Sequence, residues 1–132
     1  MEEILRKMGI SQNTINQMME LEPNIKNLTK EDIQNRIEIL KNIDCDDTQV
    51  RNIISSNASY LDKSINDINN LINTLQKYGF SNLNLLFDGN PYILDLNDFE
   101  ITNYIEQKKE MGENIENIID EMEANPYLFE EI

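Results

Sequence analysis

The chain of 132 residues repeats itself every 33 to 35 residues, and this periodicity limits its possible folds more than any other feature. One set of equivalent positions is formed by Pro23, Ala58, Pro91 and Pro126. A second set lies upstream in each unit and is formed by Gly9, Asp44, Gly79 and Gly112. From the first set to the next member of the second, the step is always 21 residues. A repeat of this length is typical of stacked helical units rather than of one irregular core.

Apolar residues keep the same frame. Eight positions before the proline-type position stand Ile15, Val50, Leu83 and Ile118. Four positions before it stand Met19, Ile54, Phe87 and Met122. Ten, fourteen and twenty positions after it stand Ile33, Ile68 and Ile101, then Ile37, Ile72 and Ile105, then Ile43, Tyr78 and Met111. Spacings of four mark one buried face of a helix. Two further aromatic residues, Phe80 and Phe99, also fall at positions expected in the core.

Each unit is therefore predicted to be a longer helix, a turn and a shorter helix. The longer helices are expected over 30–42, 64–77 and 98–110, with a truncated first copy over 2–8, and the shorter ones over 12–21, 47–56, 82–88 and 113–124. Thr29 and Ser64 are candidate N-caps. At the glycine-type position a helix is expected to end in a residue with the left-handed backbone conformation. Glycine adopts this conformation readily, and Asp44 tolerates it.

These elements predict an all-α fold, a small α-solenoid of about four stacked helix–turn–helix repeats in a single domain, 1–132. The repeat units are approximately 1–25, 26–60, 61–93 and 94–132. An ordinary helical bundle with accidental repeats is the alternative.

The repeat resembles that of the mitochondrial transcription termination factor (mTERF) family. Its Leu-x-x-x-Gly-Phe/Ile-Ser segment is matched by residues 5–11 and 75–81, and its Asn-Pro-x-x-Leu segment by residues 90–94 and 125–129. The second unit departs from both signatures at Asp44 and Ala58. The resemblance implies a curl of helical repeats whose concave face binds nucleic acid and regulates transcription or organellar gene expression.

Net charge opposes that function. The chain has 25 acidic and 11 basic side chains, no histidine and a net charge of −14, whereas duplex-binding domains usually carry a basic patch. Residues 1–66 carry −3 and residues 67–132 carry −11. No apolar run is long enough to span a membrane and no signal peptide is evident, so a cytoplasmic protein without a membrane partner is expected.

Cations nevertheless recur just before each glycine-type position. They are Arg6, Lys7, Lys41, Lys77, Lys108 and Lys109. One interpretation is that they complement the negative ends of helix dipoles, as Asp32, Asp67 and Glu100 would complement the positive ends. The other is a ligand-facing column of Arg6, Lys7, Lys41, Lys77 and Lys109.

Catalysis is not expected, nor is a metal or another cofactor. Without histidine the commonest general base and metal ligand is absent. The acidic cluster around Cys45 would raise the pKa of its thiol, and neither this cluster nor Asp88, Asn90 and Asp95 follows a calcium-loop pattern. Tyr92 and Tyr127 follow the prolines and are candidate exposed aromatics.

Two functions remain. The first is a non-enzymatic α-repeat interaction module that holds a protein partner with a basic face, favoured by the negative charge. The alternative is mTERF-like nucleic-acid binding through the cation column, which net charge disfavours without forbidding.

Overall fold

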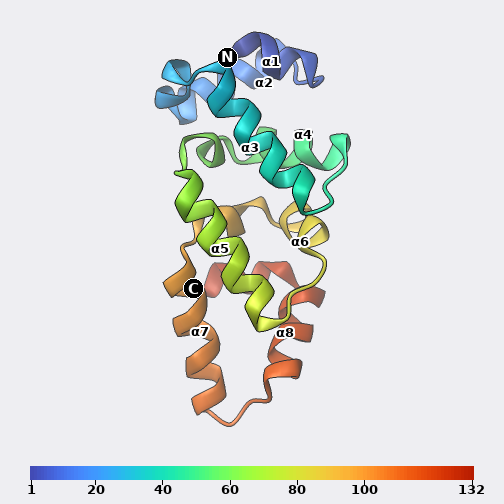
Figure 1. The fold of residues 1–132 in the computed structure, drawn as a ribbon, viewed down its shortest axis with the longest axis vertical. Helices are drawn as coiled ribbons and strands as arrows, with labels where there is room; N and C mark the ends of the chain where they lie inside the picture. The colour runs from blue at the N-terminus through green and yellow to red at the C-terminus, as the bar shows by residue number, and fades with distance from the viewer. The chain divides into compact units, whose positions relative to one another are not determined.

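The computed structural model describes residues 1–132 and contains eight α-helices, four 3-10 helices and no strand (Figure 1). The α-helices are α1 (Glu2–Lys7), α2 (Gln12–Leu21), α3 (Lys30–Asn42), α4 (Asp47–Ser56), α5 (Ile65–Tyr78), α6 (Leu83–Gly89), α7 (Asp98–Glu110) and α8 (Ile115–Ala124). The predicted all-α repeat fold is confirmed, with helix ends within two residues of those expected. None of the helices is long and apolar enough to cross a membrane.

Side chains cap the first turns of several helices, including the predicted N-caps Thr29 and Ser64. Thr29 accepts a hydrogen bond from the backbone N–H of Asp32, and the Asp32 carboxylate accepts one from the N–H of Thr29, a reciprocal capping box. The Ser64 hydroxyl accepts from the N–H of Asp67. Asp46 caps α4 in the same reciprocal way. These caps satisfy N–H groups that have no partner within the helix.

Four left-handed residues end the longer helices. Gly9, Gly79 and Gly112 have φ of 93°, 109° and 91°, and Asp44 has φ of 71°. Asp44 is the one residue other than glycine with a positive φ. The prediction for the glycine-type position is thus confirmed in all four repeats.

A 3-10 helix follows each shorter helix, and the sequence did not predict it. The four are η1 (Pro23–Asn27), η2 (Ala58–Asp62), η3 (Pro91–Asp95) and η4 (Pro126–Glu131), each beginning at the proline-type position. Proline suits this place because its fixed φ fits a first helical turn and its missing N–H is not needed there. Each repeat is therefore a longer helix, a shorter helix and a 3-10 helix.

The chain divides into two compact units, Met1–Lys63 and Ser64–Ile132. The division lies close to the predicted boundary between the second and third repeats, so each unit holds two repeats. The organisation of 1–132 as one domain stays a prediction, and the units are described separately below.

In unit 1 the 3-10 helix η2 packs against α2, α3, α4 and η1. Tyr60 and Leu61 of η2 have no exposed surface. The Tyr60 hydroxyl donates a hydrogen bond of 2.7 Å to the carbonyl oxygen of Arg36 in α3, and burial raises the Tyr60 pKa. The buried Arg36 guanidinium donates to the carbonyl oxygens of Asp32 and Lys63, at 3.0 and 2.8 Å. These contacts tie α3 to the segment that ends unit 1.

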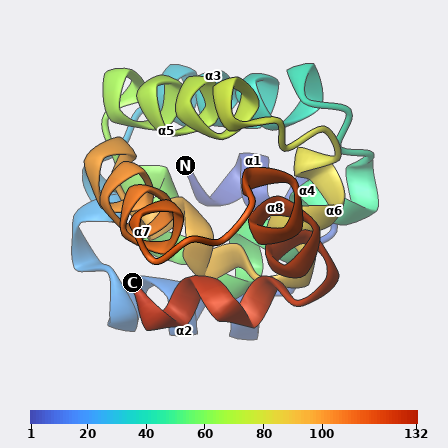
Figure 2. The ribbon, with the colours of Figure 1, turned by 90° about the horizontal axis from the view of Figure 1, so that it is seen from below.

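In unit 2, α5 packs against α7, and α7 and α8 run antiparallel on either side of the turn at Gly112 (Figure 1). Figure 2 shows α7 and α8 nearly end-on, side by side. The rings of Phe80 and Phe129 are 5.8 Å apart and bring η4 against the segment after α5. The Asn90 side-chain amide donates to the carbonyl oxygen of Pro126, joining η3 to η4.

Two details of the predicted core are wrong. Phe99 is 61% exposed and Met111 is 79% exposed. Phe99 lies in the first turn of α7, on the side of that helix away from Ile101 and Ile105, which are fully buried. Met111 follows the last residue of α7, where the period of the helix no longer holds its side chain against the core.

Candidate anion-binding groove

A groove of about 500 Å³ in unit 1 is lined by residues from α1, α3 and α4 and the residues that adjoin them. Its apolar part, here named the groove floor, consists of Ile4, Met8, Ile37 and Val50. Its charged part consists of four cations, Lys7, Lys30, Lys41 and Arg51, and one carboxylate, Asp47. With four cations against one carboxylate, this basic groove differs sharply from the chain as a whole.

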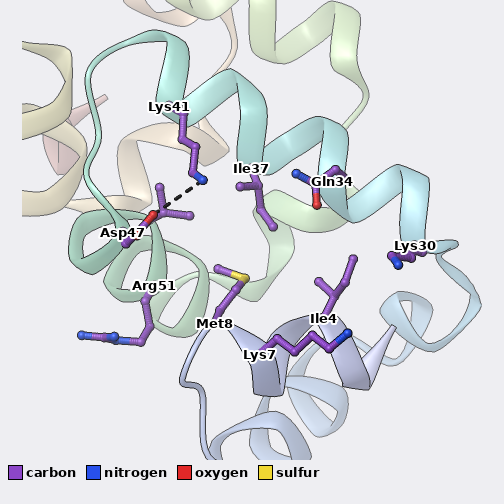
Figure 3. Close-up of a pocket in the computed structure, with 10 residues that line it drawn as sticks. Ile4, Lys7, Met8, Lys30, Gln34, Ile37, Lys41, Asp47 and Arg51 are labelled. Atoms are coloured by element: carbon purple, nitrogen blue, oxygen red, sulfur yellow. Dashed lines mark ion pairs between the residues drawn. The ribbon is translucent and has the colours of Figure 1, made fainter.

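The four cations are spread around the basic groove (Figure 3). Lys7, in the last turn of α1, and Lys30, the first residue of α3, lie at one end. Lys41, in the last turn of α3, lies at the other end and points towards Asp47. Arg51, in α4, points away from Lys41, and its guanidinium lies beside Gly9.

Two of the four groove cations have a carboxylate partner. Lys7 Nζ lies 3.3 Å from Glu3 Oε1, and Lys41 Nζ lies 3.6 Å from Asp47 Oδ1. The hydrogen bond from Lys7, followed by its charge, lowers the Glu3 pKa, and the charge of Lys30 adds to this effect. Lys30 and Arg51 take part in none of the ion pairs of the structure. They are the two groove cations without an ion pair, although the charge of Lys30 still acts on Glu3.

The structure brings Lys7 and Lys41 of the predicted cation column into one groove and places the others elsewhere. Arg6 lies outside the groove, where its guanidinium donates to Gln12 Oε1 at 2.7 Å. Lys77 and Lys109 belong to unit 2, and Lys109 Nζ lies 3.5 Å from Glu106 Oε2. All five occupy last turns of helices, as the dipole interpretation requires. A single column through the whole chain stays a prediction.

Lys30 and Arg51 were missed by the sequence analysis, although each leaves a signal. Lys30 is a cation in the first turn of a helix, where the dipole favours acidic residues. Arg51 is the one charged residue at its repeat position, which holds Asn16, Asn84 and Ile119 in the other units. Lys30 departs from the preference of the helix dipole and Arg51 departs from the repeat pattern, so both residues could have been noticed in the sequence.

Unit 2 has a groove of opposite charge. A hollow of about 380 Å³ is lined by the end of α5, Ser81 and one face of α8, including Glu116, Asp120 and Glu123 but no cation. Beside it, the Tyr78 hydroxyl donates a hydrogen bond of 2.8 Å to Glu106. Burial and this bond raise the Tyr78 pKa, and the same bond lowers the Glu106 pKa. Anions are disfavoured at this groove.

The candidate exposed aromatics lie on the 3-10 helices of unit 2. Tyr92 is 41% exposed and Tyr127 is 62% exposed. The buried Asn90 side chain accepts from the N–H of Tyr92, which anchors the backbone beneath that ring. A ligand role for either ring stays a prediction. Nowhere do three or more Cys, Asp or Glu side chains gather as a set of metal ligands.

Comparison with protein families matched the chain to the mTERF family over residues 2–126. Comparison with curated proteins gave no match. The match spans nearly the whole chain and includes both departures from the signature noted in the second repeat.

Proposed function

Since the chain belongs to the mTERF family, whose helical-repeat members are typically nucleic-acid-binding and non-enzymatic, we propose that it binds nucleic acid without catalysis. The basic groove of unit 1 makes the phosphate contacts. The observation that carries this proposal is the groove's excess of cations, two of which have no carboxylate partner. When Lys and Arg side chains that form no other ion pair bind to phosphates, they release the counterions of the nucleic-acid backbone, and this release favours binding.

The division of charge supports the same assignment. Unit 1 carries eight basic and eleven acidic side chains, whereas unit 2 carries three and fourteen. Phosphate binding depends on the potential at the contact surface rather than on the charge of the chain. The net charge of −14 therefore weakens long-range attraction but leaves the basic groove as a local site.

Binding of labelled single- and double-stranded DNA and RNA at about 50 and 200 mM salt tests the proposal. We expect binding at the lower salt that weakens steeply at the higher. Lys30→Ala and Arg51→Ala should each weaken it, whereas the matched control Lys26→Ala, an exposed lysine of η1 outside the groove, should not. No binding at the lower salt, or equal losses in all three variants, would contradict the proposal.

A second candidate function, an interaction module for a protein with a basic face, is favoured by the acidic groove of unit 2. Its three carboxylates Glu116, Asp120 and Glu123 lie on one face of α8 and form no ion pair. Nuclease-treated lysate should yield a protein retained by the wild type and lost when all three become amides. Equal retention by both forms would argue against this function. The cytoplasm is the compartment we propose for either function.

A further inference from the structure

A second hollow in unit 2 adjoins its acidic groove. It has a volume of about 320 Å³ and is lined by Asn82, Leu85, Leu86, Glu123 and Ala124. The first three belong to α6 and its N-cap, and the last two belong to the end of α8, which lies on the same side of unit 2 as α6 (Figure 1). Glu123 also lines the acidic groove, so the two hollows meet at this residue. Together they form one surface, here named the docking face, with an apolar end at Leu85 and an acidic end along α8.

Leu85, at the apolar end, is exposed, and the repeat does not require a leucine there. Its residue is 61% exposed. The equivalent positions of the other repeats, six residues before the proline-type position, hold Gln17, Asn52 and Asp120. All three are polar and exposed, so this position faces solvent in every repeat. Leu85 therefore does not serve the core, and the hollow beside it offers an apolar side chain of a partner a place to pack.

The acidic end carries three carboxylates in one line. Glu116, Asp120 and Glu123 are four and three residues apart, which places them on one face of α8. None of them takes part in an ion pair, because the two ion pairs of unit 2 are made by other carboxylates. Like charges at this spacing repel one another, so the line is unfavourable until cations from outside the chain face it.

We propose that the docking face binds a basic amphipathic helix of a partner protein. One apolar side chain of that helix packs in the hollow at Leu85, and Lys or Arg side chains at intervals of three and four residues face the three carboxylates of α8. This inference rests on the second candidate function, an interaction module for a protein with a basic face, and adds the kind of segment that is bound. Helices that lie in a groove are recognised by side chains at these same intervals.

Charge decides between this occupant and others. Unit 2 has three basic and fourteen acidic side chains, so its field attracts a basic segment and repels nucleic acid and anionic membranes. An uncharged apolar segment would cover the carboxylates without pairing them, which is unfavourable. The three carboxylates are not gathered as a set of metal ligands either. A helix that carries both an apolar side chain and cations matches both ends of the docking face.

Two designed peptides test the proposal, by fluorescence anisotropy with the full chain at about 50 mM salt. The leucine peptide is a labelled helix of about 15 residues, rich in Ala and Gln, with one Leu and three Lys at the intervals of the docking face. The alanine peptide replaces that Leu by Ala and keeps the charge. The leucine peptide should bind about fivefold or more tighter than the alanine peptide. Equal binding would overturn the docking face, because charge alone would then explain the interaction.

Variants of the apolar end extend the test. Leu85→Gln introduces the side chain that the first repeat has at this position, and should weaken binding of the leucine peptide about fivefold while leaving that of the alanine peptide unchanged. Leu85→Met keeps an apolar side chain and should retain most of the affinity. The matched control Leu21→Gln changes an exposed leucine of α2 in unit 1 and should have no effect. Unchanged binding of the leucine peptide by Leu85→Gln would overturn the assignment of the hollow.

The acidic end is tested by a variant in which all three of its carboxylates become amides. This variant should weaken binding of both peptides about fivefold or more. The matched control makes the same change in net charge at three exposed carboxylates of unit 2 outside both hollows, as Glu110→Gln, Glu121→Gln and Glu130→Gln. Equal losses in the two variants would overturn the docking face, because only the net charge would then matter.

Failure of the docking face and failure of the second candidate function are distinguishable. If neither peptide binds, the docking face is wrong. The second candidate function fails as well only if the nuclease-treated lysate also yields no protein that depends on the three carboxylates.

Discussion

Replacing Asp47 by asparagine should strengthen anion binding at the basic groove, because it releases Lys41 for phosphate. Asp47 Oδ1 lies 3.6 Å from Lys41 Nζ, and the Asp47 side chain is 92% exposed. Exposed ion pairs of this kind contribute about 0.2–1 kcal/mol. If that interaction competes with phosphate, its loss should tighten binding by about 1.4- to 5-fold.

The dependence on salt gives a second magnitude. Two of the four groove cations, Lys30 and Arg51, are unpaired, and Asp47→Asn would add Lys41 as a third. For single strands the slope of log K against log[salt] is about −0.7 per phosphate neutralised. We therefore expect a slope of about −1.4 for the wild type and about −2.1 for the variant.

Fluorescence anisotropy with a labelled single strand of about 15 nucleotides, titrated from about 50 to 200 mM salt, measures both quantities. Asp62→Asn is the matched control, because it makes the same change in net charge at an exposed residue of η2 outside the groove. Asp47 also lies in the first turn of α4, so the melting temperature of each variant should be recorded.

A local effect separates the two variants, whereas a general effect of net charge does not. If Asp47→Asn and Asp62→Asn change affinity and slope equally, the groove is not the contact surface. If Asp47→Asn weakens binding while remaining folded, the argument that Lys41 is held back by Asp47 is wrong.

Four further predictions concern stability and are measured by urea unfolding. Gly79→Ala should destabilise the protein by about 1–2 kcal/mol, because φ is 109° and the added methyl group meets nothing within 4 Å, so conformation alone sets the cost. Conversely, Asp44→Gly removes the strain of a positive φ, about 1–2 kcal/mol, and adds about 0.5–1 kcal/mol of backbone entropy to the unfolded chain. A net stabilisation of about 0–1.5 kcal/mol is expected, and a loss of stability would show that the Asp44 side chain does more than tolerate its backbone. Tyr60→Phe should cost about 1 kcal/mol, because it removes one buried hydrogen bond while keeping the ring. The pKa of Asp32 is lowered by its hydrogen bonds with Thr29, most of all by the one from the backbone N–H. The ionised carboxylate therefore contributes its full stabilisation of the folded protein above the ordinary carboxyl pKa, and this stabilisation is lost as pH falls through the lowered pKa. Asp32→Ala should therefore destabilise at about pH 7 and much less at about pH 2.

The sequence predicted the helices well because the signals that start and end them are local. Thr29 and Ser64 lie three residues before the N–H groups that they cap, and Gly79 needs only its own backbone to end α5. Because four repeats share one frame, the limits of a helix in one repeat could be checked against the equivalent positions in the other repeats. The 3-10 helices were missed because a segment of five or six residues is too short to show a period, although the prolines marked where three of them begin.

The candidate site was predicted only in part. Lys7 and Lys41 were identified because they recur in the repeat, and the repeat itself hid Lys30 and Arg51, which break it. Phe99 was placed in the core with the apolar positions of the repeat, yet it projects from the exposed face of α7. Patterns along the chain identify a face of a helix, but they do not specify which other helix faces it.

By itself, then, the sequence determined the all-α repeat, the limits of its helices, its left-handed turns and the unequal charge of its two halves. Each of these depends on residues within a few positions of one another or on a simple count. Only the tertiary structure decided that residues of α1, α3 and α4 line one groove. It also decided that two of the four groove cations form ion pairs, with Glu3 and Asp47, while Lys30 and Arg51 form none. The physical reason is that a groove and its ion pairs depend on distances between side chains far apart in the sequence, which packing sets.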